Sequence, residues 1–440
     1  MVCDRLEKFE KGLRMLIGAV ADDITGATDL CLMLTRSGLR TVQIMGVPEA
    51  NSLLPNVDAV VIALKSRTIP ADAAVAKSVA AAKVLLAAGA RQILFKYCST
   101  FDSTDAGNIG PVTAALMALM GVDLTIACPA FPATGRTVYQ GHLFVLGKLL
   151  SDSPMKDHPL TPMRDANLVR VLTPQTSVPV GLVAADVVRD GVDAVRAGFA
   201  AARAAGQGIV ITDALTNADL MVLGAACADM KLVTGGSGIA MGLAQNFVAA
   251  GKVAQDKMPR TMPAPAGRSV VLAGSCSTAT LGQIAAARAA RMPILVLDAA
   301  ALADGRQTAA EVADWAAAQT GNLAPVICSS ADAATLSQIQ ARLGRAASGE
   351  LVERTLANIA RLLQAKGFTR FLIAGGETSG AVVAGLGVQS LHIGPEIDPG
   401  VPWTRCVDGP DLALALKSGN FGAPDFFVRA WTLLTDEVAA

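Results

Sequence analysis

Short apolar segments alternate along this chain with helical patterns, and this alternation constrains the fold more than any other feature. Residues 15–21, 41–45, 58–64 and 92–96 are apolar runs of strand length, and an alanine-rich helical pattern occupies residues 71–88. Strands that alternate with helices predict βαβ units and a mostly parallel sheet. Ligands of such sheets bind beyond the carboxyl ends of the strands. The polar residues that follow each run are therefore the first candidates for a functional site.

The alternation is interrupted twice. Residues 131–175 are rich in proline, glycine and polar residues, which predicts a long irregular segment that is either functional or disordered. Residues 256–267 contain three prolines in a stiff, polar context, which predicts a linker between domains. We therefore expect an α/β protein with an N-terminal tail at 1–14, a first domain at 15–255 and a second domain at 268–440. Each domain is expected to be a mostly parallel sheet flanked by helices.

The composition argues against several classes of protein. The formal net charge is zero and aromatic residues make up 4% of the chain, so we expect no nucleic-acid partner. No apolar stretch reaches the roughly 20 residues that a membrane span needs, so we expect no membrane association. The eight cysteines form no CxxC pair and the three histidines are dispersed, which favours a reduced, cytoplasmic protein without a protein-held metal cluster. A homodimer is the default expectation for the assembly.

Charged residues follow several strands of the first domain. Asp22 and Asp23 stand where the first strand meets a helix, so one carboxylate could cap the helix while the other faces a ligand. We take Asp23 as the first choice, and Asp22 as the second, for the group that orients a substrate hydroxyl or accepts its proton. Lys96 ends another strand, and Arg67 follows the strand at 58–64. Both cations could bind a substrate carboxylate, and an arginine would do so at two points.

The segment after Lys96 is rich in hydroxyl and amide groups. Ser99, Asp102 and Asn108 lie in it and are expected to contact a polar, carboxylate-bearing substrate, although the same composition is also typical of solvated turns. His158 lies in the proline-rich interruption. A lone histidine is more often structural than catalytic, but its polar neighbours favour a place in substrate binding.

Turns rich in glycine and hydroxyl residues follow the strands of the second domain. Turns of this kind between a strand and a helix bind phosphates through backbone N–H groups and the helix dipole. None of them has the GxxxxGK[ST] pattern of a P-loop, and no GxGxxG opens the first βα unit, which argues against an NAD-dependent oxidoreductase. The residues expected to contact a nucleotide are Ser275, Gly375, Gly376, Glu377, Thr378 and Gly419.

Taken together, these motifs resemble the four-carbon acid sugar kinase family over nearly the whole chain after Met15. The matching stretches are ADDITGA (21–27), KYCSTFDSTDAGNIGP (96–111), CPAFPATGRTVYQG (128–141), DSPMKDHPLTPMR (152–164), GGETSG (375–380) and GPEIDPGVPW (394–403). The CSTFDST form and the SPMKDHPLTPM run resemble the branch that acts on 3-oxo-tetronate. Relatives that act on threonate or erythronate tend to carry a lysine loop closer to KKxDSTLRGN.

The resemblance implies that the first domain binds a sugar acid, that the second binds a nucleotide, and that the active site lies in the cleft between them. The implied reaction transfers a phosphate from ATP, with Mg²⁺, to the C4 hydroxyl of 3-oxo-tetronate. A kinase for threonate, erythronate or a branched oxo-acid sugar stays open, because one or two hydroxyl contacts separate such substrates. A regulator that keeps the fold without catalysis is the alternative from another class of protein.

Overall fold

The computed structural model describes residues 15–49, 53–158, 161–253, 258–329 and 344–436. The expected N-terminal tail lies outside these residues. The chain divides into two compact units, Met1–Lys257 and Met258–Ala440, which are called the first and the second domain below. Within the described residues, no helix has the length and apolar character needed to cross a membrane.

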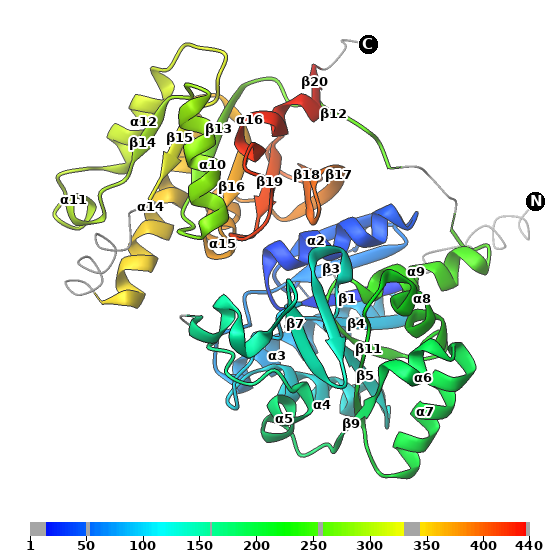
Figure 1. The fold of residues 1–440 in the computed structure, drawn as a ribbon. Coiled ribbons are helices and arrows are strands. Elements are labelled where there is room, and N and C mark those ends of the chain that lie inside the picture. Colours follow the sequence, from blue (N-terminus) through cyan, green and yellow to red (C-terminus); the bar gives the residue numbers. More distant parts are fainter. Residues whose placement is uncertain (1–14, 50–52, 159–160, 254–257, 330–343, 437–440) are drawn as a thin grey trace, which may run out of the picture. The chain divides into compact units, whose positions relative to one another are not determined.

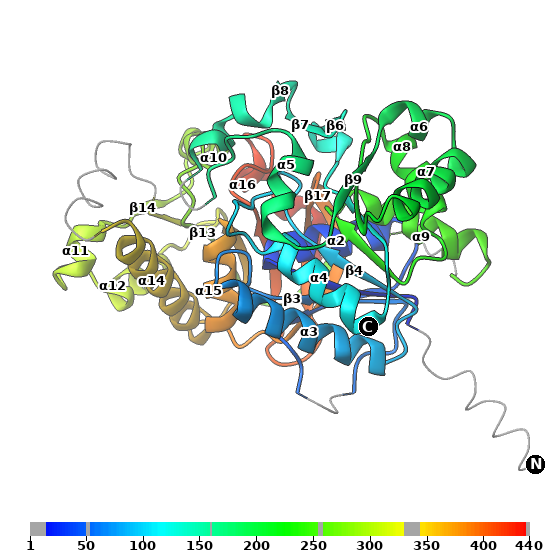
Figure 2. The ribbon, with the colours of Figure 1, turned by 90° about the horizontal axis from the view of Figure 1, so that it is seen from below.

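The first domain is built on a parallel sheet with helices on both faces (Figures 1 and 2). Its strand order is β2-β3-β1-β4-β11-β5-β10-β9. Every residue of β1, β3 and β4 is buried, as continuous apolar runs in a parallel sheet predict. The bounds are β1 (Ile17–Ala21), β2 (Thr41–Met45), β3 (Ala59–Ala63), β4 (Gln92–Lys96), β5 (Thr125–Cys128), β9 (Val180–Val183), β10 (Ile209–Thr212) and β11 (Leu232–Gly235).

Two neighbouring strands of the first domain, β1 and β4, are followed by helices that cover opposite faces of the sheet. Helix α2 (Ile24–Arg36) follows β1 and packs beside α9 (Ile239–Ala249), whereas α4 (Ile109–Met120) follows β4 and packs beside α3 (Ala71–Ala87) on the other face (Figure 2). Because β1 and β4 pair directly, this is the point at which the sheet changes winding direction. Ligands of doubly wound sheets bind at such a switch point. The remaining helices are α5 (Leu168–Leu172), α6 (Ala185–Arg189), α7 (Val192–Ala204) and α8 (Asn217–Ala226).

The expectation of an irregular segment at 131–175 is wrong in part, because this region contains a small antiparallel sheet. Its strands are β6 (Arg136–Tyr139), β7 (His142–Val145) and β8 (Lys148–Leu149). Two-residue turns join them, and Gln140 and Gly141 in the first turn both have positive φ angles of 50° and 70°. Such turns match the twist of a hairpin. The strands are too short, and too close to glycine and proline, for an alternating pattern to reveal them.

The second domain is also a mostly parallel sheet flanked by helices, with the strand order β14-β15-β13-β16-β19-β18-β17. Only the pairs β17–β18 and β18–β19 are antiparallel among these strands. The predicted fold class, α/β with two such domains, is confirmed. The strands are β13 (Arg268–Ala273), β14 (Ile294–Val296), β15 (Val326–Cys328), β16 (Phe368–Ala374), β17 (Ser390–Asp398), β18 (Val401–Cys406) and β19 (Ala413–Lys417). The helices are α10 (Thr278–Ala289), α11 (Ala299–Ala303), α12 (Ala309–Ala317), α14 (Arg345–Ala365), α15 (Gly376–Gly385) and α16 (Phe426–Arg429).

Part of the expected linker belongs to the second domain. Strand β12 (Met262–Ala264) pairs in parallel with β20 (Leu434–Asp436) near the end of the chain. Met262 is buried in the same hydrophobic cluster as Trp403. Pro263 lies within β12, which is compatible with a strand because this pair has free edges. Proline-rich composition predicts a stiff connection, but it does not exclude short pairing of this kind.

Candidate active site

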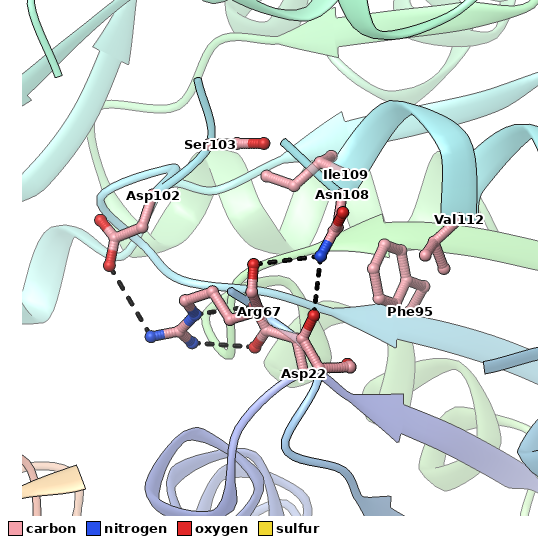
Figure 3. A pocket seen from close by; sticks show the side chains of 9 residues that line it. Asp22, Arg67, Phe95, Asp102, Ser103, Asn108, Ile109 and Val112 are labelled. Carbon is pink, nitrogen blue, oxygen red and sulfur yellow. Dashed lines mark hydrogen bonds and ion pairs between the residues drawn. The ribbon is translucent and has the colours of Figure 1, made fainter. Parts of the chain in front are cut away.

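A cluster of charged side chains lies at the carboxyl ends of β1, β3 and β4 (Figure 3). The last residues of the three strands, Ala21, Ala63 and Lys96, are paired in register, so the loops that follow begin at one level. Asp22 follows β1 and forms a two-point ion pair with Arg67 from the loop after β3. Arg67 Nε lies 2.8 Å from Asp22 Oδ2, and Nη2 lies 2.8 Å from Oδ1.

Asp23 both begins helix α2 and takes part in the charged cluster. As the N-cap residue, it accepts hydrogen bonds at Oδ2 from the Gly26 N–H at 3.1 Å and from the Thr25 hydroxyl at 2.8 Å. Its other oxygen, Oδ1, lies 2.6 Å from Arg67 Nη2 and 3.3 Å from Lys96 Nζ. Both carboxylate oxygens of Asp23 are therefore occupied by the chain itself.

The two neighbouring carboxyl groups differ in pKa. Burial raises the pKa of Asp22, and the charge of Arg67 offsets this only in part. Burial opposes ionisation of Asp23 as well, but the charges of Arg67 and Lys96 outweigh it and hold the pKa of Asp23 well below its usual range. A carboxylate with a raised pKa accepts a proton more readily near neutral pH. The pKa directions thus favour Asp22 as the proton acceptor, whereas the geometry does not separate the two, because Arg67 holds both oxygens of Asp22 as well. The choice between Asp22 and Asp23 stays a prediction.

Arg67 is shared among three carboxylates of the chain. In addition to its contacts with Asp22 and Asp23, its Nη1 lies 3.7 Å from Asp102 Oδ2. With Lys96 included, two cations face three carboxylates in these contacts, and the charge of Asp102 also acts on Arg136. The two-point geometry that we expected Arg67 to offer a substrate carboxylate is already used by Asp22.

Asn108 holds the loop that carries Arg67. Its Nδ2 donates to the backbone oxygens of Ser66 at 2.8 Å, Arg67 at 3.2 Å and Ile69 at 2.9 Å. Its Oδ1 is buried and has no hydrogen-bond partner among the described residues. A cavity of about 10 Å³ adjoins these groups, which is room for roughly one water molecule. Its lining residues are Asp22, Ser66, Arg67, Phe95, Asp102, Ser103, Asn108, Ile109 and Val112 (Figure 3).

Two of the residues predicted for substrate binding do not line this cavity. Ser99 lies in the turn after β4, next to Thr100, whose hydroxyl donates to Asp102 Oδ1 at 2.6 Å. His158 makes a local contact, with Nδ1 2.9 Å from Thr161 Oγ1, as a structural histidine would. The predicted residues that the structure brings together in the first domain are Asp22, Asp23, Arg67, Lys96, Asp102 and Asn108.

A second candidate site lies at the carboxyl ends of β13, β16 and β19, which are neighbouring parallel strands of the second domain. Their last residues, Ala273, Ala374 and Lys417, are paired in register. A glycine-containing turn follows each strand, so the three turns lie side by side. The predicted nucleotide-contacting residues in these turns are Ser275, Gly375, Gly376, Glu377, Thr378 and Gly419.

The three turns approach one another so closely that they require glycine. A Cβ at Gly274 would lie 2.1 Å from Thr378 Oγ1, and a Cβ at Gly419 would lie 2.6 Å from Ser275 Oγ. Gly375 has a φ angle of 124°, which favours glycine on conformational grounds alone. The turns lead into α10 and α15, whose first backbone N–H groups can bind an anion. The N–H groups of Gly274, Ser275 and Gly375 donate to backbone oxygens, so the first N–H groups of α15 are the ones that could bind the phosphates of a nucleotide.

Sequence reasoning missed the residues that hold the third turn in place. The carbonyl oxygen of Gly419 accepts from Ser277 Oγ at 2.5 Å, Thr280 Oγ1 at 3.1 Å and Lys417 Nζ at 2.8 Å. No role was predicted from the sequence for Ser277 or Lys417. Thr280 gave no signal because it lies in a helix far from Gly419 in sequence. Among the described residues, no group of three or more His, Cys, Asp or Glu side chains could hold a metal ion.

Comparison with known proteins matches each of the two domains to a family model. Residues 17–243 match a family model described as a sugar-binding N-terminal domain, and residues 270–427 match a nucleotide-binding C-terminal domain. A 3-oxo-tetronate kinase of Burkholderia multivorans is 56% identical over 420 residues, covering 95% of this chain and 97% of the relative. A 3-oxo-tetronate kinase of Pseudomonas fluorescens is 53% identical, covering 95% of this chain and 96% of the relative.

Two solved structures are similar over nearly the same length. A crystal structure from Salmonella typhimurium LT2 has a TM-score of 0.85 and 43% identity, covering 96% of this chain and 100% of the other. A Haemophilus influenzae protein has a TM-score of 0.76 and 42% identity, covering 95% of this chain and 100% of the other. With both domain models matched and relatives this similar over almost the whole chain, this protein belongs to the four-carbon acid sugar kinase family.

Proposed function

We propose that this chain is an ATP-dependent kinase that converts 3-oxo-tetronate to 3-oxo-tetronate 4-phosphate in the catabolism of sugar acids. The observation that carries this proposal is the match to 3-oxo-tetronate kinases at 53–56% identity over 95% of the chain. The charged cluster lies in the domain that matches the sugar-binding model, and the glycine turns lie in the domain that matches the nucleotide-binding model.

In this proposal, Asp22 orients the primary hydroxyl of the sugar acid and accepts its proton as the new bond to phosphorus forms. Burial raises the pKa of Asp22, which suits a group that must take up a proton near neutral pH. Asp23 fixes the ammonium group of Lys96, and Lys96 offers its remaining N–H bonds to the oxygens of the substrate. Phosphoryl transfer depends on positioning and electrostatic stabilisation, which such a cluster supplies.

The nucleotide would bind across the three glycine turns of the second domain. Ser275, Gly376, Thr378 and Gly419 would contact its phosphates, and the exposed Glu377 lies in the first turn of α15. Mg²⁺ would neutralise phosphate charge, and it usually keeps several waters and few protein ligands. The phosphate oxygens would face the first backbone N–H groups of α15 and those around Gly419, because the N–H groups of Gly274, Ser275 and Gly375 already donate to backbone oxygens.

Several expectations from the sequence stay predictions. These are the location of the chemistry in a cleft between the domains, the substrate contacts of Ser99, Asn108 and His158, the cytoplasmic location and the homodimer. A kinase for threonate, erythronate or a branched oxo-acid sugar is the alternative within the family. It differs from the main proposal only in the contacts that the sugar-binding domain makes with the substrate.

The test is a coupled assay of ADP release with Mg-ATP and a panel of four-carbon acids. Turnover confined to 3-oxo-tetronate would support the proposal. Turnover with threonate or erythronate alone would keep the kinase and reject the substrate. Absence of turnover with every acid, together with retained ATP binding, would favour a regulator that binds ligands without catalysis.

A further inference from the structure

Lys417 is a buried lysine in the second domain that forms no ion pair with any of the residues that the structure describes. It ends strand β19 and its side chain is fully buried. Its Nζ donates to Gly419 O at 2.8 Å, Ser418 O at 3.0 Å and Thr280 Oγ1 at 3.2 Å. All three acceptors are uncharged. No carboxylate among the described residues pairs with this ammonium group, although an unpaired charge in the interior is costly.

Lys96 shows what a buried lysine with a partner looks like in the same chain. Lys96 is also buried, but it contacts Asp23, and although burial opposes its charge, the nearby carboxylates raise its pKa. Burial alone lowers the pKa of Lys417 to about 7. The difference between the two lysines that matters for protonation is a neighbouring negative charge, which Lys96 has and Lys417 lacks among the described residues.

The charged and titratable groups around Lys417 do not supply that negative charge. Cys276 and Glu377, in the two adjacent turns, are exposed, and neither contributes to the pKa of Lys417. Arg288 lies in the last turn of α10, at the opposite end from Thr280. Asp398 and Asp425, near α16, both pair with Arg429. None of these described groups supplies a negative charge to Lys417, and a bound anionic ligand would supply one.

Lys417 is placed directly behind the candidate phosphate site. Its Nζ binds the inner side of the Gly419 carbonyl, and Ser277 and Thr280 bind the same oxygen. In a trans peptide the N–H group points opposite to the carbonyl group. The Asn420 N–H is therefore turned away from Lys417 by the contacts that hold the carbonyl inward. The peptide group between Gly419 and Asn420 therefore separates the lysine from the side of the turn to which the Asn420 N–H points.

We propose that Lys417 is the charge-balancing residue of the nucleotide site, and that it takes up a proton from solvent when the nucleotide phosphates bind across the three glycine turns. The inference rests on the proposed nucleotide-binding function. Without nucleotide, Lys417 is partly neutral, and the neutral amine, which has two N–H groups, keeps two of its three hydrogen bonds. With nucleotide, the phosphate charge stabilises the ammonium form. Nucleotide affinity is then linked to pH. It falls as pH rises above the pKa that Lys417 has in the nucleotide-free protein.

The first test uses the full chain, Mg²⁺ and the ATP analogue AMP-PNP, without any sugar acid. Calorimetric titrations at about pH 8 in two buffers of different ionisation enthalpy give the number of protons taken up. The expected value is close to about 0.9 proton per chain, and affinity should fall by about fivefold between about pH 7 and pH 8. Proton uptake by the terminal phosphate of the nucleotide is measured separately with the Lys417→Met variant, which lacks only the lysine.

The second test compares Lys417→Met with Lys366→Met. Lys366 lies at the exposed end of α14 and pairs with Asp314, so this matched control should leave both affinity and proton uptake unchanged. Lys417→Met should abolish proton uptake and weaken binding at about pH 7 by at least about tenfold. If Lys417→Met does not fold, proton uptake by the unmodified chain decides the question alone.

The outcomes separate this inference from the proposed function. AMP-PNP binding without proton uptake at about pH 8, or uptake that persists in Lys417→Met, would overturn the role of Lys417 and leave the nucleotide site intact. Absence of any AMP-PNP binding by the unmodified chain would overturn both. Proton uptake that is lost only in Lys417→Met would support the inference.

Discussion

Gly26 and Lys96 are packed so closely that a Cβ at position 26 would lie 1.7 Å from Lys96 Nζ. The helix that begins at Asp23 thus passes directly beneath the ammonium group. Only a residue without a side chain allows Lys96 to reach Asp23 at 3.3 Å while Asp23 also caps the helix. The glycine in the ADDITGA motif is therefore a requirement of the charged cluster rather than of the helix, where glycine is unfavourable.

Gly26→Ala should displace Lys96 and reduce turnover by at least about a hundredfold, because small displacements of positioning groups have effects of this size. The matched control is Gly282→Ala in α10, where an added Cβ meets nothing within 4 Å. Turnover should be unchanged in Gly282→Ala, and thermal stability equal or higher, since alanine is the better helix former. A Gly26→Ala enzyme with normal turnover would show that the position of Lys96 does not matter for catalysis.

Asp22→Asn should reduce turnover by at least about a hundredfold if Asp22 accepts the proton of the substrate hydroxyl. The amide retains the size of the side chain but cannot accept a proton. Steady-state kinetics with separate kcat and KM values check this prediction, because loss of the proton acceptor should lower kcat more than it changes KM. If Asp22→Asn retains most of its kcat while Asp23→Asn loses it, the roles are those first expected from the sequence.

Asp23→Asn should mainly reduce stability. The pKa of Asp23 is lowered in the folded protein, so its charge stabilises the fold above the unfolded value of about 3.9, and this stabilisation is lost as pH falls toward the folded pKa. Breaking a buried ion pair costs roughly 3–5 kcal/mol, and the lower end applies because Asp23 is 24% exposed.

Thermal unfolding followed by circular dichroism at several pH values checks the prediction for Asp23. At neutral pH the variant should have a lower Tm than the unmodified chain. Below about pH 4 the difference should shrink, because Asp23 is then protonated in the unfolded chain but still charged in the folded chain, so folding has to release that proton. A difference in Tm that stays constant down to acidic pH would assign the effect to packing instead of charge.

Gly274→Ala should weaken nucleotide binding by at least about tenfold, because its Cβ would lie 2.1 Å from Thr378 Oγ1 and would push two glycine turns apart. The sugar-binding domain is far from this change in sequence, so thermal stabilisation by the sugar acid should be unchanged. Gly321→Ala, where the added Cβ meets nothing within 4 Å, is the matched control in the same domain. Equal nucleotide affinity in Gly274→Ala and Gly321→Ala would remove the first turn from the nucleotide site.

Much of the fold could be predicted from the sequence. Strands at 41–45 and 92–96 were predicted at their observed bounds, because short apolar runs between polar residues leave few alternatives in a parallel sheet. The hairpins within 131–175 could not be predicted, because their strands have two to four residues and are stabilised by pairing that only the fold provides. The same holds for β12, whose partner β20 lies at the other end of the second domain.

The sequence by itself determined which residue types follow each strand, and therefore that carboxylates and cations meet at one sheet edge and glycine turns at another. It could not decide which charge pairs with which, because Asp22, Arg67 and Lys96 are brought together by strand register across 74 positions of the chain. Only the tertiary structure showed that Asp23 caps helix α2 and that Lys417 has no carboxylate partner among the described residues. Protonation depends on burial and on the nearest charges, and both are properties of packing in three dimensions.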